Sequence, residues 1–186
     1  IHTMGCKSNQ FEGAIIEENL IDAGFEKVSE IKDADLYILN SCSVTHKSDD
    51  EALYLLRHAK HTNENIKTLI TGCVAQIERD KLLEYDFVDF VLGNNEKLNI
   101  VEFLQKNEDC EVGDIMNMTD FHEGVLIDTT KTRASLKIQD GCDNRCAYCI
   151  IPFARGKSRS AKSDFIIDQI KSFEKHGFKE VIFTGI

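Results

Sequence analysis

The first 106 residues alternate between short apolar segments and amphipathic segments, and this alternation restricts the fold more than any other feature of the chain. Short apolar runs that end in glycine or polar residues are typical of buried strands, while apolar residues at helical spacing are typical of helices that cover a sheet. We expect strands at residues 1–4, 36–40, 66–71 and 87–92 and helices at residues 8–23, 49–61, 75–84 and 96–105. A repeat of strand and helix favours a parallel sheet with helices on its faces. The predicted fold class is therefore α/β, with an open parallel sheet and flanking helices in residues 1–106.

The rest of the chain divides into an irregular connection and a second, smaller unit. Residues 107–133 are polar and lack periodicity, which predicts a linker with a short hairpin near residues 125–127. Residues 134–186 form the second predicted domain. Its expected elements are a strand, an amphipathic helix and a strand, at residues 134–139, 162–176 and 181–184. Together they make one βαβ unit.

The composition is that of a folded, soluble protein. Hydrophobic residues make up 42% of the 186 residues and charged residues 29%, which is ordinary for a chain that buries a core. No apolar run approaches the roughly 18 residues that span a bilayer, and the chain begins without a secretion signal, so we expect a cytoplasmic protein with no membrane contact. The net charge of −10 argues against a large nucleic-acid surface within these residues.

Seven cysteines without a secretion signal indicate metal binding or catalysis rather than disulfides. Three of them, Cys142, Cys146 and Cys149 (the loop cysteines), have the spacing C-x3-C-x2-C and follow a predicted strand. This spacing differs from the C-x2-C pairs of zinc sites and from the C-x2-C-x2-C run of ferredoxins. Three thiolates can hold three irons of a [4Fe–4S] cluster and leave the fourth iron free to bind a substrate. A zinc site completed by a histidine or a distant cysteine, or buried structural cysteines, are the alternatives.

Three further cysteines are far apart in sequence, yet each directly follows a predicted strand. They are Cys6, Cys42 and Cys73 (the edge cysteines). Because the carboxyl ends of parallel strands share one edge of a sheet, we expect these cysteines to converge and to offer a second set of three thiolates. The alternative is that each is a small buried hydrophobic residue near a strand end. Cys110 fits neither set, and we expect no role for it.

The segment at residues 141–149 resembles the signature of the radical S-adenosylmethionine (SAM) superfamily, C-x3-C-aromatic-C, with Tyr148 in the aromatic slot. The two cysteine sets together resemble the radical-SAM methylthiotransferase family. The motifs that carry this resemblance lie at residues 3–10, 40–45, 71–73 and 141–152. It implies an amino-terminal methylthiotransferase domain at residues 1–106, followed at residues 134–186 by the first βαβ unit of a partial (β/α) barrel.

The resemblance also implies two [4Fe–4S] clusters and SAM as cofactors. The loop cysteines, beside Tyr148, would hold the cluster that binds SAM and cleaves it to a radical that takes a hydrogen atom from C2 of an adenine. The edge cysteines would hold an auxiliary cluster that presents a methylated sulfur to the substrate radical. The two sets are therefore expected to face each other across a cleft. Ser8, Asn9 and Gln10 would hydrogen-bond cluster sulfurs, with helix capping as the alternative for Ser8.

The branch of the family can be predicted from residues 151–160. They are most similar to the branch that converts N6-threonylcarbamoyladenosine at position 37 of tRNA to its 2-methylthio derivative. The alternatives are the branch that acts on N6-isopentenyladenosine in tRNA and the branch that modifies an aspartate of a ribosomal protein. Within this segment, Arg155, Lys157 and Arg159 are predicted either to form a basic stripe for a tRNA phosphate or the threonylcarbamoyl carboxylate, or to be solvated loop residues.

The chain starts with Ile1 and stops just after the strand predicted at residues 181–184, so we expect a fragment. The resemblance implies that most of the barrel and a carboxy-terminal RNA-binding domain are absent, and that tRNA is bound mainly by those parts. It also implies an electron donor such as flavodoxin or ferredoxin. We expect this fragment alone to be inactive.

Two other classes of function remain open. An iron–sulfur electron carrier would also suit a small acidic chain with two clusters. Carriers normally close every iron with a protein ligand, however, whereas each set here offers three cysteines. A zinc-stabilised binding module predicts a colourless protein with stoichiometric zinc.

Overall fold

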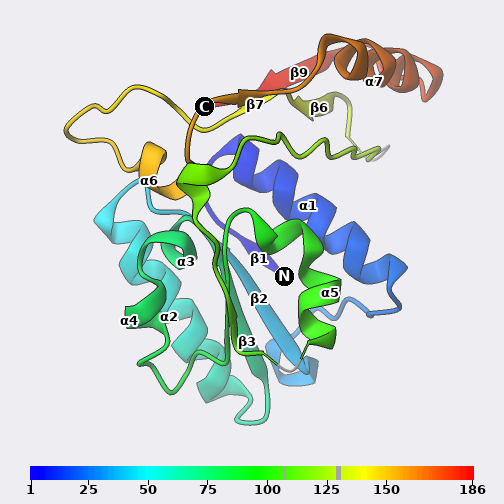
Figure 1. Ribbon diagram of the computed structural model, residues 1–186. Helices are drawn as coiled ribbons and strands as arrows, with labels where there is room; N and C mark the ends of the chain where they lie inside the picture. The colour runs from blue at the N-terminus through cyan, green and yellow to red at the C-terminus, as the bar shows by residue number, and fades with distance from the viewer. Residues whose placement is uncertain (107, 129–130) are drawn as a thin grey trace.

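A computed structural model describes residues 1–106, 108–128 and 131–186 (Figure 1). Within these ranges, five parallel strands form a sheet in the order β1-β2-β3-β4-β5. The strands are β1 (His2–Thr3), β2 (Leu36–Ser41), β3 (Lys67–Gly72), β4 (Phe90–Leu92) and β5 (Cys110–Glu111). The predicted α/β class with an open parallel sheet is confirmed.

Helices cover both faces of this sheet, because its central strands are apolar on both sides. Ile38 on β2 and Leu69 on β3 point into one core, while their neighbours Leu39 and Ile70 point into the other. The first core is closed by α1 (Lys7–Asp22) and α5 (Ile100–Gln105). The second is closed by α2 (His46–Thr62), α3 (Cys73–Ile77) and α4 (Arg79–Leu82). Figure 1 shows the resulting three layers, with the sheet between the two groups of helices.

Several elements of the first unit differ in their bounds from the prediction. The helix expected at residues 75–84 is two short helices that begin at Cys73, because Glu78 leaves the helical conformation between them. The helix expected at residues 96–105 starts as a 3-10 turn, η2 (Glu96–Asn99), before α5 begins. The prediction that Ser8 caps α1 is wrong. Cys6 occupies the cap position, and Ser8 is buried with its hydroxyl 3.4 Å from that of Thr184.

The predicted linker contains a strand that joins the first sheet. β5 pairs with β4 in parallel register, so this sheet extends beyond residue 106 to Glu111, and Cys110 lies within it. The 3-10 turn η3 (Ile115–Asn117) follows. Residues 125–127 belong to no strand in the described part of the chain, so the expected hairpin is wrong. Of the predicted linker, residues 107, 129 and 130 lie outside the described ranges.

The second unit contains the predicted βαβ arrangement. β6 (Ala134–Lys137) pairs in parallel with β9 (Val181–Thr184), and α7 (Ser163–Lys175) lies between them in the chain. Phe173 of α7 packs on Ala134 and Leu136 to form a small core. The strand predicted at residues 134–139 ends early, because β7 (Gln139–Asp140) leaves β6 to pair antiparallel with β8 (Arg159–Ser160).

The short helix α6 (Ile151–Arg155) was not predicted; it packs on α3 and thereby joins the second unit to the first. Within the described ranges, every helix is too short or too polar to cross a bilayer.

Candidate metal centre

The edge cysteines lie where the first three strands of the sheet end. Cys6 follows β1 at the cap position of α1, Cys42 directly follows β2, and Cys73 is the first residue of α3, directly after β3. Because β1 pairs with β2 and β2 with β3 in parallel register, these three ends lie side by side. The structure therefore brings the three cysteines to one edge, as the topology predicted.

The Cys42 sulfur lies between the chain after β1 and the start of α3. Gly5 has a φ of +84°, and a Cβ atom at this position would overlap the Cys42 sulfur. Burial raises the pKa of the Cys42 thiol, and the charges of Cys73 and Cys6 raise it further, so the three sulfurs are within electrostatic range of one another. Cys42 and Cys73 are buried whereas Cys6 is exposed, so the edge set has one dry side and one open side.

Two buried asparagines hold the chain segments that carry the edge cysteines. Asn9 Nδ2 lies 3.1 Å from the carbonyl oxygens of both Asn40 and Ser41, and Asn40 Nδ2 donates to the Asn9 carbonyl at 3.0 Å. The Gln10 amide donates to the Gly5 carbonyl at 3.4 Å. Both amides bind backbone in this structure, and their role as donors to cluster sulfurs stays a prediction.

Asn94, which the sequence did not single out, is the side chain that contacts a cysteine sulfur. It lies in the loop after β4, and its Nδ2 is 3.7 Å from Cys73 Sγ. The same nitrogen donates to the Ala154 carbonyl at 2.7 Å, and Asn94 Oδ1 accepts from Lys97 Nζ at 2.7 Å. The signal that could have found it is its position, because it follows the fourth strand at the same edge of the sheet.

The loop cysteines lie between β7 and α6, in a loop held by backbone contacts. Gly141 has a φ of +70°, and a Cβ atom there would overlap the Lys157 carbonyl. Cys142 N–H donates to the Gly156 carbonyl at 3.0 Å, and Cys149 N–H donates to the Cys146 carbonyl at 2.9 Å. Cys146 is exposed and the other two are half-buried. Tyr148 is 91% exposed, so this aromatic ring faces solvent rather than a core.

The donor sets can be tested against the metal groups they would suit. Among the described residues, no three Cys, His, Asp or Glu side chains lie close enough to bind one metal ion. A zinc site needs such convergence, whereas a cubane cluster binds each cysteine through a different iron and so tolerates wider spacing of the sulfurs. The two sets of three cysteines therefore fit iron–sulfur clusters better than a single zinc ion.

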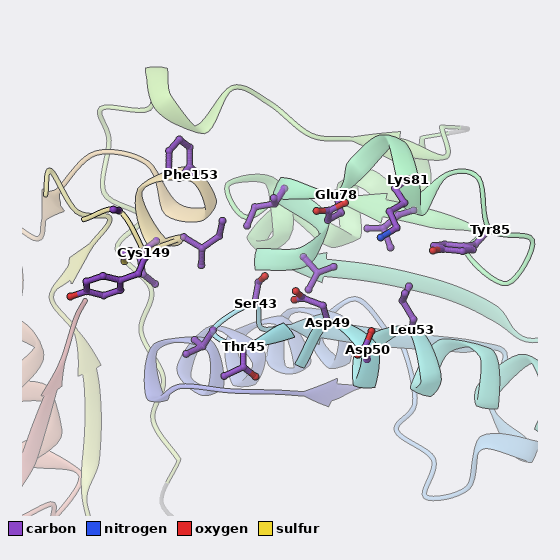
Figure 2. Close-up of a pocket in the computed structure, with 18 residues that line it drawn as sticks. Ser43, Thr45, Asp49, Asp50, Leu53, Glu78, Lys81, Tyr85, Cys149 and Phe153 are labelled. Carbon is purple, nitrogen blue, oxygen red and sulfur yellow. The ribbon is translucent and has the colours of Figure 1, made fainter. Parts of the chain in front are cut away.

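A cavity of about 840 Å³ lies beside the loop cysteines (Figure 2). Cys149 and Phe153 line one side, and the opposite side contains residues that directly follow Cys42 and Cys73. Of the six cysteines in the two sets, Cys149 alone lines this cavity, so the expected cleft between the two sets stays a prediction. The lining of the cavity is as follows: Ser43, Val44, Thr45, Asp49, Asp50, Leu53, Val74, Ile77, Glu78, Lys81, Leu82, Tyr85, Ala147, Tyr148, Cys149, Ile150, Ile151 and Phe153.

The predicted basic stripe is not an exposed surface. Arg155 is only 1% exposed, and its guanidinium contacts Glu12 at 3.0 Å and Asp140 at 3.0 Å. The Arg159 side chain is also largely buried, 3.8 Å from Asp140, while Lys157 remains exposed. The two arginines are turned inward because buried carboxylates lie beneath them.

Arg155 belongs to a group of buried ion pairs that joins the two units. This group (the charge cluster) consists of Glu12, Lys97, Lys137, Asp140 and Arg155. Burial would raise the pKa of Glu12, but Arg155, Lys97 and Lys137 outweigh it and hold this pKa well below the usual value. Burial opposes the charge of Arg155 too, but Glu12, Asp140 and Cys73 raise its pKa well above the usual value. Both groups are therefore ionised in the folded protein.

Comparison with known proteins matches both units of the chain. Residues 1–93 match the family described as "Uncharacterized protein family UPF0004", and residues 136–186 match the radical SAM superfamily.

Three relatives illustrate the range of similarity to whole proteins. The threonylcarbamoyladenosine tRNA methylthiotransferase of Aquifex aeolicus is 35% identical over 98% of this chain and 46% of its own length. The protein of the same name from Rickettsia prowazekii is 38% identical over 100% of this chain and 42% of its own. The tRNA-2-methylthio-N(6)-dimethylallyladenosine synthase of Thermodesulfovibrio yellowstonii is 32% identical over 100% of this chain and 44% of its own. The chain thus spans less than half the length of these relatives.

Proposed function

This chain belongs to the family described as Uncharacterized protein family UPF0004 and contains a radical SAM segment, and we propose that the protein is a tRNA methylthiotransferase. The observation that supports this most directly is a cavity of about 840 Å³ that is lined by Cys149 and by Ser43 and Val74, the residues that directly follow Cys42 and Cys73. Radical insertion of sulfur at a carbon requires the radical source and the sulfur source to reach the same atom, and reacting groups must be held in contact for an efficient step. A cavity beside the candidate cluster sites provides room for a base at that point.

The loop cysteines and the edge cysteines are the proposed ligands of two [4Fe–4S] clusters, in domains that we assign to residues 134–186 and to residues 1–111. When bound, the loop cluster would supply the electron that cleaves SAM, and the edge cluster would supply the sulfur. The chain's own residues shape the reaction space between them. Ile150, Ile151 and Phe153 line it with apolar surface, and Asp49, Asp50, Glu78 and Lys81 line it with charged groups.

We propose N6-threonylcarbamoyladenosine at position 37 of tRNA as the substrate. Relatives named for this nucleoside are 34–38% identical to the chain, whereas those named for dimethylallyladenosine are 32–33% identical. The dimethylallyl nucleoside is the second candidate, because those relatives also match the whole chain. The proposed reductant is a small electron carrier such as flavodoxin or ferredoxin.

The first test counts metals. The chain is purified and reconstituted without oxygen, and iron, sulfide and zinc are measured for the parent and for a variant in which all three edge cysteines are alanine. We expect about eight irons per chain in the parent and about four in the variant, as for two [4Fe–4S] clusters that are lost separately. Zinc without sulfide, or equal iron in parent and variant, would contradict the assignment of the edge cysteines.

The second test identifies the nucleoside. The complete gene product is expressed in a bacterial strain that lacks its own methylthiotransferases for tRNA, and the tRNA nucleosides are separated and weighed by mass spectrometry. We expect the 2-methylthio derivative of threonylcarbamoyladenosine. Methylthiolation of the dimethylallyl nucleoside alone would favour the second candidate, and unmodified tRNA would contradict both.

A further inference from the structure

The charge cluster contains more positive than negative charge. Among the described residues it pairs two carboxylates, Glu12 and Asp140, with the cations Lys97, Lys137 and Arg155, and the buried side chain of Arg159 adds a fourth cation 3.8 Å from Asp140. Lys97 and Arg155 are each 1% exposed, so water does not screen this excess. Excess charge is costly to bury unless an anion offsets it. An anion bound nearby would offset this excess.

Burial lowers the pKa of Lys97, but its hydrogen bonds to three oxygen atoms favour the charged ammonium form. Its Nζ donates to Glu12 Oε2 at 2.6 Å, to Asn94 Oδ1 at 2.7 Å and to Asn9 Oδ1 at 3.3 Å. An ammonium group has three N–H donors, and this geometry satisfies all three with oxygen acceptors. Lys97 therefore lies fixed in place with its charge.

Asn94 connects this charge to a cysteine sulfur. Its Oδ1 accepts from Lys97, and its Nδ2 points the other way, to Cys73 Sγ at 3.7 Å. A hydrogen bond from a cation polarises the amide, so the opposite N–H becomes a stronger donor toward the sulfur. Arg155 of the second unit is held close to Asn94 through the preceding residue, because Asn94 Nδ2 also donates to the Ala154 carbonyl.

A [4Fe–4S] cluster bound through three thiolates would be an anion at this position, and its negative charge increases on reduction. Nearby cations and N–H donors to sulfur stabilise the more negative state and so raise the reduction potential. We propose that Lys97 and Arg155 are positioning residues that raise the reduction potential of the cluster bound by the edge cysteines, with Asn94 linking Lys97 to the Cys73 sulfur. This inference rests on the proposed function. One of its two cations belongs to the second unit, so this potential depends on contact between the units.

The test measures a reduction potential rather than activity. The loop cysteines are replaced by serine so that only the edge cluster remains, iron and sulfide are counted, and the midpoint potential is obtained by redox titration with EPR detection. In this background Lys97→Met removes one buried cation and keeps an unbranched side chain that is one atom shorter. Lys97→Arg keeps the charge, and Glu12→Gln removes a negative charge from the same cluster. Lys60→Met is the matched control, because Lys60 is a partly buried, ion-paired lysine beside Asp89 at the opposite end of β3.

We expect a lower potential for Lys97→Met, a higher potential for Glu12→Gln, and values near the parent for Lys97→Arg and Lys60→Met. Packing damage alone cannot produce opposite shifts of this kind. Arg155→Met gives a second measurement with an expected decrease, which matters if Lys97→Met does not fold. An edge cluster with full iron and an unchanged potential in both cation variants would overturn this inference and leave the proposed function intact. A background protein without iron and sulfide would overturn both.

Discussion

Gly5 has a backbone conformation that strains other residues, and it also lies against a sulfur. Its φ is +84°, and a Cβ atom would overlap Cys42 Sγ. We expect Gly5→Ala to lower the free energy of unfolding by about 3 kcal/mol, from backbone strain plus overpacking, and to reduce iron loading at the edge cysteines. Gly24→Ala is the control, because Gly24 has a φ of +91° with open space around it. The Gly24→Ala variant should lose only about 1 kcal/mol of its free energy of unfolding and keep its iron. Urea unfolding and iron counts compare the two, and equal iron loss would contradict the close packing on Cys42.

Asp89 makes the stability of the chain depend on pH. Burial would raise the pKa of Asp89, but hydrogen bonds from Lys60, Lys67 and the Thr68 N–H lower it to about 2. The folded pKa lies below the unfolded value, so this stabilisation is complete above about pH 4 and is lost as the pH falls toward 2. Allowing for solvent screening, we expect ionised Asp89 to contribute about 1 kcal/mol to the free energy of unfolding. Asp89→Asn should be less stable than the parent at pH 6, with the difference shrinking at pH 2.5. A constant difference in urea midpoints would contradict this.

The first turn of α2 is a single element on which both stability and the cavity depend. Thr45 accepts a hydrogen bond from the Ser48 N–H at 3.2 Å, and Thr45 also lines the cavity. Thr45→Ala should cost about 1 kcal/mol of stability, as for other helix caps, while Thr45→Ser should retain it. Thr62→Ala at the far end of the same helix is the control, because the Thr62 hydroxyl donates to the His58 carbonyl within the helix and caps no helix start. Thermal unfolding measures all three variants, and a loss with Thr45→Ser as large as that with Thr45→Ala would exclude capping as the cause.

Helices and strands long enough to show a repeating pattern of apolar residues were predictable, whereas the two-residue strands β5, β7 and β8 were not. The βαβ order and the arrival of the edge cysteines at one edge follow from strand and helix periods, which local sequence contains. β5 has only two residues and gains its place from pairing with β4, so no period marks it. The same applies to β7 and β8. Arg155 appeared to be a loop cation because its partner Glu12 is far away in sequence, and only tertiary structure reveals that its charge is buried.

At the scale of the whole molecule, buried charges join the two units in addition to the packing of α6 on α3. Glu12 on α1 accepts from Lys137 of β6 and from Arg155 of α6, and Ser8 of α1 meets Thr184 of β9. Such a joint fixes orientation, since ion pairs with several hydrogen bonds tolerate little displacement. Residues of both units line the cavity, so its shape depends on the orientation that this joint fixes.

This joint can be measured by a double-mutant cycle on Glu12→Gln and Arg155→Met. Each change breaks a buried ion pair and should lower the free energy of unfolding by about 3–5 kcal/mol. Because the two residues share one interaction, the double variant should lose less than the sum by at least about 1 kcal/mol. Hydrogen exchange should show the loss of protection first in β6 and β9, since these strands lose their anchor on α1. The exposed Asp168–Lys171 pair is the control, because breaking it should have little effect on the free energy of unfolding or on hydrogen exchange. Additive losses would mean that the second unit is held to the first by other contacts, and that the cavity geometry does not depend on the charge cluster.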